Sequence, residues 1–273
     1  MTTIRRRTVL AAIGAMATAP AAAVALSPTA AYAADDYASN TALYADPSLA
    51  EGVDYARRYH RHEAVDNSDT AAAAFPDTVV LALHGGGIEP GTSELCMAIA
   101  GYHPATGSVE PVGGPTYDYW MFEGIRSSNN SPLHVTSTHC DDPVARALAA
   151  GARRAVSLHG CTPAQAGLAD GTAAVLIGGL DTTLKNELLS LFAIGSIQGI
   201  QDIQAYDAAS IPALGGDDPA NIVNRTLTGG GVQLELTTPL RNAMFTTNTR
   251  AQRKNTTTPA FWRFVNVVRT ALQ

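Results

Sequence analysis

Four ionisable side chains have the types and the spacing of a hydrolytic metal site. His84 and His159 each follow directly after a short apolar run, Glu89 comes shortly after His84, and Glu235 interrupts a third apolar run. The glycines between His84 and Glu89 let the backbone turn tightly enough for both side chains to reach one ion. Two histidines and one carboxylate are the usual protein ligands of a catalytic zinc ion, which keeps a fourth position for water. The spacing by itself fits this interpretation and a set of ordinary polar loop residues equally well.

The same loop also matches a different chemistry. The stretch 84–87 reads His-Gly-Gly-Gly, which is similar to the oxyanion loop of esterases. Such an enzyme needs a G-x-S-x-G turn between a strand and a helix. The chain has none, because in Gly-Ser-Ile-Gln-Gly at 195–199 the serine directly follows the glycine. The zincin signature H-E-x-x-H is absent as well, and we expect His60 and His62, in a charged stretch, to be solvated.

Apolar runs and helical spacing alternate along the chain. Short apolar runs predict strands at 78–83, 117–122, 134–138, 155–158, 175–177 and 232–236. Helical spacing and capping residues predict helices at 48–52, 93–100, 144–154, 182–192 and 261–272. The alternation indicates an α/β layered domain with a largely parallel sheet. In open sheets of this kind ligands bind outside the carboxyl ends of the strands, which is where His84 and His159 lie.

Composition excludes several classes of protein. The 273 residues are 46% hydrophobic and 15% charged, which is enough apolar material for a core and unlike a disordered chain. The net charge of −6 argues against a nucleic-acid partner, because such a partner favours a basic surface. Three cysteines are too few for a disulfide-rich scaffold, and we expect mostly free thiols at Cys96, Cys140 and Cys161.

The first 33 residues have the pattern of an export signal. The pair Arg6-Arg7 precedes an alanine-rich apolar stretch, and Ala31-Tyr32-Ala33 supplies a small-residue cleavage site. The arginine pair is typical of the twin-arginine route, with an ordinary secretory signal as the alternative. We therefore expect a secreted, extracellular bacterial protein. Its expected parts are a cleaved signal peptide at 1–33, an N-terminal segment and connector at 34–76, and one domain at 77–273.

Removal of that signal makes the chain more acidic. The signal carries three of the 18 basic residues and no acidic one, so 15 basic and 24 acidic residues leave a mature charge of −9. No later stretch reaches the roughly 18 consecutive apolar residues that suggest a membrane span, so we expect no membrane contact after cleavage. A chain of this charge does not attract a polyanion by its mean field, so recognition of a polyanion has to be local.

Seven longer blocks carry a more specific signal. They span 84–94, 119–124, 133–143, 156–160, 178–181, 218–225 and 231–236, and the first reads His-Gly-Gly-Gly-Ile-Glu-Pro-Gly-Thr-Ser-Glu. In this order they resemble the poly-γ-glutamate hydrolase family of phages and bacteria, over about residues 36–241. Compared with that family, the chain has extra residues in the loop 102–116 and a longer connector at 66–76.

The resemblance implies a fold similar to that of zinc carboxypeptidases, with a mixed, mostly parallel sheet flanked by helices. It implies one Zn²⁺ per chain, held by His84, Glu89 and His159. From the residues alone, His139 competes with His159 as the third ligand. Glu235 then corresponds to the carboxypeptidase general base, which would take a proton from a water that zinc activates. The expected function is that of a secreted zinc-dependent hydrolase, which cleaves γ-glutamyl amide bonds in poly-γ-glutamate or related peptides.

An anionic glutamyl polymer or peptide, the expected substrate, carries an α-carboxylate beside each γ-glutamyl bond. Arginine receives a carboxylate best, because it offers two parallel hydrogen bonds. We expect this role for Arg225, with Arg126 and Arg241 as further candidates. His134 and His139 are expected either to orient the substrate and donate to the oxyanion, or to have a satisfied role in the core.

Two other functions stay open at this point. One is an inactive zinc-containing module that binds anionic polymers or cell-wall peptides, which would have no need of a base at Glu235. The other is a zinc esterase or deacetylase, which the extra loop at 102–116 leaves open. For Glu235 itself, the structural alternative is a buried ion pair with an arginine.

Overall fold

The structure, a computed structural model, describes residues 35–62, 77–109, 114–197 and 203–273. The expected signal peptide at 1–33 and the longer connector at 66–76 lie outside the described residues. The strands are β1 (Tyr55–His60), β2 (Thr78–Gly86), β3 (Asp118–Gly124), β4 (Arg154–Cys161), β5 (Ala174–Gly178), β6 (Gln204–Asp207) and β7 (Val232–Thr237). The α-helices are α1 (Asn40–Tyr44), α2 (Thr92–Ile99), α3 (Pro143–Gly151), α4 (Thr182–Ile197), α5 (Thr238–Ala243) and α6 (Pro259–Ala271). None of the helices in these ranges is both long and apolar enough to cross a membrane.

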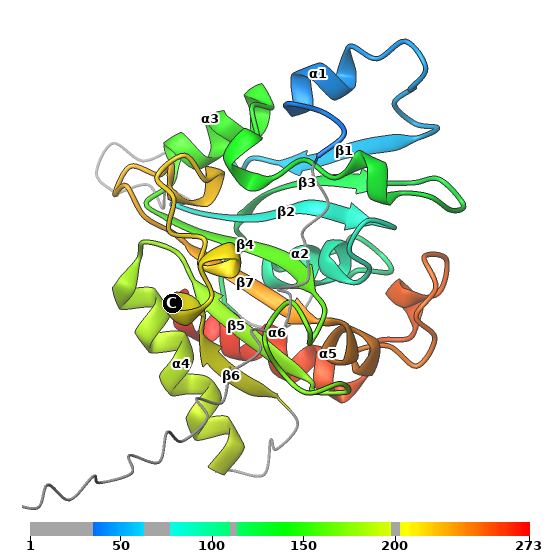
Figure 1. The fold of residues 1–273 in the computed structure, drawn as a ribbon. Helices are drawn as coiled ribbons and strands as arrows, with labels where there is room; N and C mark the ends of the chain where they lie inside the picture. The colour runs from blue at the N-terminus through cyan, green and yellow to red at the C-terminus, as the bar shows by residue number, and fades with distance from the viewer. Residues whose placement is uncertain (1–34, 63–76, 110–113, 198–202) are drawn as a thin grey trace, which may run out of the picture.

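The seven strands form one sheet in the order β1-β3-β2-β4-β7-β5-β6 (Figure 1). The pairs β3/β2, β2/β4, β4/β7 and β5/β6 are parallel, whereas β1/β3 and β7/β5 are antiparallel. The prediction of an α/β fold with a mixed, mostly parallel sheet is therefore confirmed. Strand β1 comes from the stretch predicted to be an N-terminal segment and connector, so that part of the chain adds an edge strand to the sheet.

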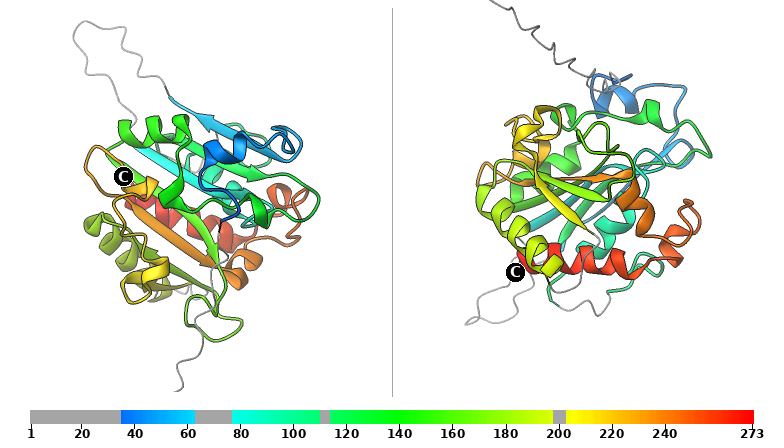
Figure 2. Two further views of the ribbon diagram at one scale, coloured as in Figure 1. Left: turned by 45° about the horizontal axis from the view of Figure 1, so that its top comes forward. Right: turned by 60° about the horizontal axis from the view of Figure 1, so that its bottom comes forward.

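Helices cover both faces of the sheet (Figure 2). Side chains alternate along β2, so that Val80 and Ala82 join one apolar cluster with α2, α4 and α6. Val79 and Leu81 join a second cluster, on the opposite face, with α1 and α3. Strands β2 and β7 are buried along their whole length, as expected for central strands of a sheet covered on both faces.

The predicted strand at 134–138 is wrong. This stretch follows the 3₁₀ turn Ser131–Leu133 and runs into a second one, Ser137–His139. Pro132 lies in the first turn, where its missing N–H is no cost. The Thr136 N–H donates to the Asp35 carboxylate (2.7 Å) instead of to a neighbouring strand. This hydrogen bond comes from a residue about 100 positions away, which an apolar-run pattern cannot reveal.

The predicted helix at 48–52 is also wrong, because the short helix of this region is α1. Ser39 begins it, since the Ser39 Oγ accepts a hydrogen bond from the Ala42 N–H (3.2 Å). The sequence interpretation also missed the strands β1 and β6 and the helix α5. β1 and β6 are edge strands with largely exposed side chains, so they lack the apolar pattern that identified the central strands.

Candidate metal centre

Strand pairing sets His159 and Glu235 side by side. β4 and β7 are parallel, and in their register His159 stands opposite Glu235 while Leu158 stands opposite Leu234. Successive side chains of a strand point to opposite faces. Both leucines pack into the apolar cluster with α2 and α6, so His159 and Glu235 share the other face, where they line a cavity.

A β-bulge brings His84 to the same face. Between Ala82 and Gly85 the pairing of β2 with β3 shifts by one residue. Without this shift, regular alternation would point His84 to the face of Ala82, into the apolar core. The extra residue turns the imidazole to the face that carries His159, and bulges commonly redirect a side chain in this way beside active sites.

The loop after β2 folds back so that Glu89 reaches His84. The Glu89 N–H donates to the His84 carbonyl (2.8 Å). Gly86 has a φ of +67°, and a Cβ there would lie 2.3 Å from the Gly124 carbonyl oxygen, so only glycine fits. The Gly160 N–H at the end of β4 donates to Glu89 Oε2 (2.8 Å). The carboxylate is therefore held between the ends of β2 and β4.

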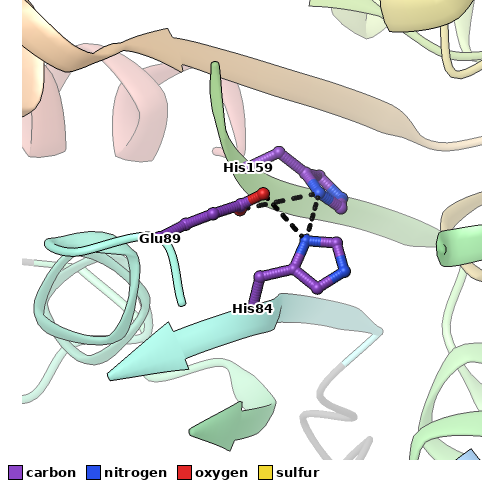
Figure 3. Close-up of side chains that lie close together, drawn as sticks. All are labelled: His84, Glu89 and His159. Carbon is purple, nitrogen blue, oxygen red and sulfur yellow. Dashed lines mark hydrogen bonds and ion pairs between the residues drawn. The ribbon is translucent and has the colours of Figure 1, made fainter. Parts of the chain in front are cut away.

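The ligand atoms of His84, Glu89 and His159 converge on one point (Figure 3). His84 Nδ1 lies 3.1 Å from Glu89 Oε1 and 3.1 Å from His159 Nδ1, and His159 Nδ1 lies 3.9 Å from Glu89 Oε2. In a tetrahedral zinc site with bonds of about 2.0–2.1 Å, ligand atoms stand roughly 3.3 Å apart, so this spacing fits the ion. Across the described ranges, no second trio of histidine, cysteine, aspartate or glutamate converges in this way.

Hydrogen bonds also orient the imidazole rings of His84 and His159. His84 Nε2 lies 2.9 Å from the Val135 carbonyl oxygen, which can only accept, so Nε2 carries a proton and Nδ1 is the ring nitrogen that faces the cluster. His159 Nε2 lies 3.3 Å from Ser137 Oγ, and a hydroxyl suits either form of the ring. Both histidines are thus tied at one nitrogen and directed at the common point with the other, as metal ligands are.

The charged groups of the cluster shift one another's pKa values. Burial would raise the pKa of Glu89, but the charge and hydrogen bond of His84 outweigh burial and lower that pKa to about 2. Burial and the nearby His84 lower the pKa of His159 to about 3, so its imidazole is neutral at pH 7. Against the effect of burial, the Glu89 charge raises the pKa of His84. A metal ion has to displace protons from its ligands, and two of these three are already deprotonated.

Glu235 is buried and is oriented by two amide side chains. Gln233 Nε2 donates to Glu235 Oε1 (2.9 Å), and Asn221 Nδ2 donates to Gln233 Oε1 (2.7 Å). Burial and the Glu89 charge raise the pKa of Glu235 well above its usual value, which makes it a stronger base than an exposed glutamate. Among the described residues no arginine forms an ion pair with Glu235, although the charge of the nearby Arg241 opposes part of this rise in its pKa. The sequence interpretation missed Gln233, although it stands two residues earlier on the same face of β7.

A cavity of about 610 Å³ opens at this end of the sheet and contains the cluster. His134 lines it, with its ring stacked on that of His84 at 3.8 Å between ring centroids. His134 Nδ1 lies 2.8 Å from Asp35 Oδ1. The sequence interpretation missed Asp35, because a contact between residues 99 positions apart leaves no local pattern.

The structure does not bring the other predicted substrate residues into the cavity lining. Arg126 Nε lies 2.8 Å from Asp54 Oδ1, in an ion pair. Arg225 follows the 3₁₀ turn Ile222–Asn224 and does not contribute to the cavity wall. His139 Nδ1 lies 3.3 Å from the Asp35 carboxylate, but the side chain is half exposed and the converging trio contains His159 instead.

Arg241 is buried next to the site, where its hydrogen bonds hold three segments of the backbone together. It donates to the carbonyl oxygens of Leu236 (3.1 Å), Pro90 (3.1 Å) and Cys161 (3.4 Å). A Cβ at Gly160 would lie 2.6 Å from the guanidinium carbon, so the arginine packs directly against the end of β4. These contacts join the loop of Glu89 to β4 and β7, and Arg241 is not part of the cavity lining.

Comparisons with known proteins identify the family of the chain. The family model described as poly-gamma-glutamate hydrolase matches residues 58–267. The chain is 32% identical to the SPbeta prophage-derived UPF0714 protein YoqZ and 29% identical to UPF0714 protein YndL, each over 190 residues and both from Bacillus subtilis (strain 168). These alignments cover 70% of this chain but 60% of YoqZ and 65% of YndL, so the chain spans less than two thirds of either relative.

Two solved structures share the fold. A bacteriophage poly-gamma-glutamate hydrolase matches with a TM-score of 0.68 and 31% identity, over 88% of this chain and 97% of that one. The zinc-free apo form of YndL matches with a TM-score of 0.67 and 26% identity, over 88% of this chain and 98% of that one. The strand order, the strand-end site and the family match over most of the chain lead to one conclusion: this protein belongs to the poly-gamma-glutamate hydrolase family.

Proposed function

We propose that this protein is a zinc-dependent amide hydrolase that cleaves γ-glutamyl bonds in glutamyl polymers or peptides, with one zinc ion per chain. The main support is the convergence of His84 Nδ1, His159 Nδ1 and the Glu89 carboxylate beside Glu235 in one cavity. Three protein ligands leave a fourth position, as in catalytic zinc sites. The family match supports the hydrolase class, and the zinc-free description of the YndL structure supports the choice of metal.

The residues of the site have separate roles in this proposal. A zinc ion held there would polarise the scissile carbonyl and lower the pKa of a water molecule towards about 7. Glu235 takes a proton from the attacking water and passes it to the leaving amine. The hydrogen bond from Gln233 keeps the Glu235 carboxylate in one orientation, and burial keeps it a strong base. His134, held by Asp35 and stacked on His84, contacts the substrate beside the reacting carbonyl.

A panel of substrates tests the proposed reaction. The zinc-loaded mature protein should release new amines from γ-linked glutamyl oligomers and not from α-linked ones. Removal of the metal with a chelator should stop the release, and added zinc should restore it. Turnover of esters or acetylated amines in preference to γ-glutamyl amides would favour the esterase or deacetylase. Binding of the oligomers with no turnover of any substrate would favour the inactive module.

We also propose that residues 1–33 direct export by the twin-arginine route. The support is the pair Arg6-Arg7 ahead of an apolar stretch and the Ala31-Tyr32-Ala33 motif. Mass spectrometry of the secreted protein should find Ala34 at its N-terminus. Replacement of both arginines by lysine should stop export, whereas undiminished secretion would favour the general route.

A further inference from the structure

The cavity around the metal cluster is lined by many acidic residues and by no arginine or lysine of the described chain. Its acidic members are Asp35, Asp36, Glu89, Asp217, Asp218 and Glu235. All 15 arginine and lysine residues that follow the expected signal lie in described parts of the chain, and none belongs to the lining. A zinc ion would offset two negative charges among these six acidic residues, so the cavity stays negative with the metal bound.

Three of the six acids already have partners or roles in the site. Asp36, Asp217 and Asp218 differ from them, because all three are exposed and none forms an ion pair with a described residue. They come from two segments, the first described residues and the loop that precedes the turn at 222–224, and both segments contribute to one cavity wall. We call these three carboxylates the acidic rim.

Neither Arg126 nor Arg241 pairs with the acidic rim. Arg126 is paired with Asp54, and the Arg241 guanidinium is occupied by backbone carbonyls below the floor of the cavity. An incoming carboxylate would therefore find uncharged donors such as Asn129 and Gln165, which suit the single α-carboxylate of one γ-glutamyl residue. A chain with a carboxylate on every residue would also meet the acidic rim.

We propose that this enzyme prefers γ-glutamyl substrates whose residue after the scissile bond carries a positive charge, such as a γ-glutamyl-lysine peptide, over the all-carboxylate polymer. For the reaction, this inference rests on the function proposed above. For the preference, it rests on the acidic rim and on the absence of described basic residues from the lining. An ammonium group is attracted by Asp36, Asp217 and Asp218 and a carboxylate is repelled, which favours encounter and binding of the cationic peptide.

Three peptides that differ in one side chain test the preference. The zinc-loaded protein is given γ-glutamyl-lysine amide, γ-glutamyl-glutamine amide and γ-glutamyl-glutamate amide at low ionic strength, and kcat/KM is measured for each. We expect the order lysine, glutamine, glutamate, with roughly tenfold or more between the first and the last. The ratio should shrink at about 0.5 M salt, because exposed charges are then screened.

A double variant, Asp217→Asn with Asp218→Asn, assigns the effect to the acidic rim. It should reduce the lysine-to-glutamate ratio by roughly threefold or more, mainly through KM. The matched control is Asp170→Asn, an exposed aspartate outside the cavity lining, which should leave the ratio unchanged. An unchanged ratio in the double variant, or equal or better cleavage of the glutamate peptide by the wild type, overturns the inference while the proposed function stands.

A binding measurement tests the charge preference independently of the proposed reaction. Calorimetric titration of the Glu235→Gln protein with the same peptides should give the tightest binding for the lysine peptide. If the wild type cleaves none of the three, the proposed function fails. Tighter binding of the lysine peptide would then still support a cationic ligand for this cavity, and equal binding of all three would overturn that as well.

Discussion

Two clusters of histidine lie in this protein, and they differ in what the ring nitrogens face. At the edge strand β1, His62 Nδ1 lies 2.9 Å from Asp118 Oδ1 and His62 Nε2 contacts the Tyr102 hydroxyl, while His60 packs against the His62 ring. We call this group the edge cluster. In the metal cluster, His84 and His159 each leave Nδ1 facing a common point with the Glu89 carboxylate.

The difference shows what a metal site requires beyond residue types. Both ring nitrogens of His62 are already used, so the edge cluster has no converging lone pairs and serves to hold β1 and β3 to the Tyr102 loop. His62 was expected to be solvated, and this is wrong, because its side chain is only 16% exposed. Histidine beside a carboxylate is therefore a structural pair at one end of this sheet and a candidate ligand set at the other.

Replacement of one histidine from each cluster should give the largest difference in zinc content and activity. His159→Ala removes one of three ligands, so we expect loss of bound zinc and a fall of amide hydrolysis to background, by roughly a thousandfold or more. His62→Ala should keep both the zinc and the activity. Elemental analysis and turnover of the two purified variants decide this. Zinc retained by His159→Ala, or lost from His62→Ala, would reverse the assignment of the clusters, and His139→Ala should keep its zinc.

Glu235→Gln should remove the proposed general base and leave zinc binding intact. The glutamine keeps the size of the side chain, and its amide oxygen can still accept the hydrogen bond from Gln233. We therefore expect near-normal zinc content and melting temperature, with turnover lower by about a hundredfold or more. Normal turnover in a stable, zinc-loaded variant would remove Glu235 from the mechanism. A loss of stability without loss of turnover per folded molecule would mark the carboxylate as structural.

Asp35→Asn should have a smaller effect, because Asp35 acts through His134. The carboxylate accepts from the His134 ring and from the Thr136 N–H, and an amide at this position cannot accept both hydrogen bonds equally well. We expect kcat/KM to fall by roughly tenfold while zinc content and melting temperature hardly change. His139→Ala removes the other ring beside Asp35 and should change kcat/KM less than Asp35→Asn does. Equal effects of the two variants would show that His134 is not the residue that Asp35 positions.

Thiol labelling should give the smallest signal in the native protein. Cys96, Cys140 and Cys161 are buried and free in the structure, and burial raises the pKa of each thiol. The thiolate is the reactive form, so alkylation at pH 8 should be slow in the folded protein and should reach all three after denaturation. Rapid labelling of one cysteine without loss of structure would show that its surroundings open in solution.

Local patterns in the sequence were sufficient for the centre of the fold and for the family. The apolar runs before His84 and His159 and around Glu235 became β2, β4 and β7, because central strands of a covered sheet are continuous apolar segments. The residue types and the loop glycines indicated zinc ligands and a base, and the ordered motifs identified the family. The edge strands and the segment 134–138 were missed or wrong, because their hydrogen bonds come from distant parts of the chain.

Only the tertiary structure decided which polar residues meet. The bulge in β2 turns His84 out of the core, the β4–β7 register sets His159 beside Glu235, and neither is visible in spacing along the chain. Three-dimensional packing also placed Arg241 beneath the site and Asp35 beside His134. Sequence determines the chemistry that each side chain offers, whereas strand register and long-range contacts determine which lone pairs and charges share one cavity, because both depend on residues far apart in the chain.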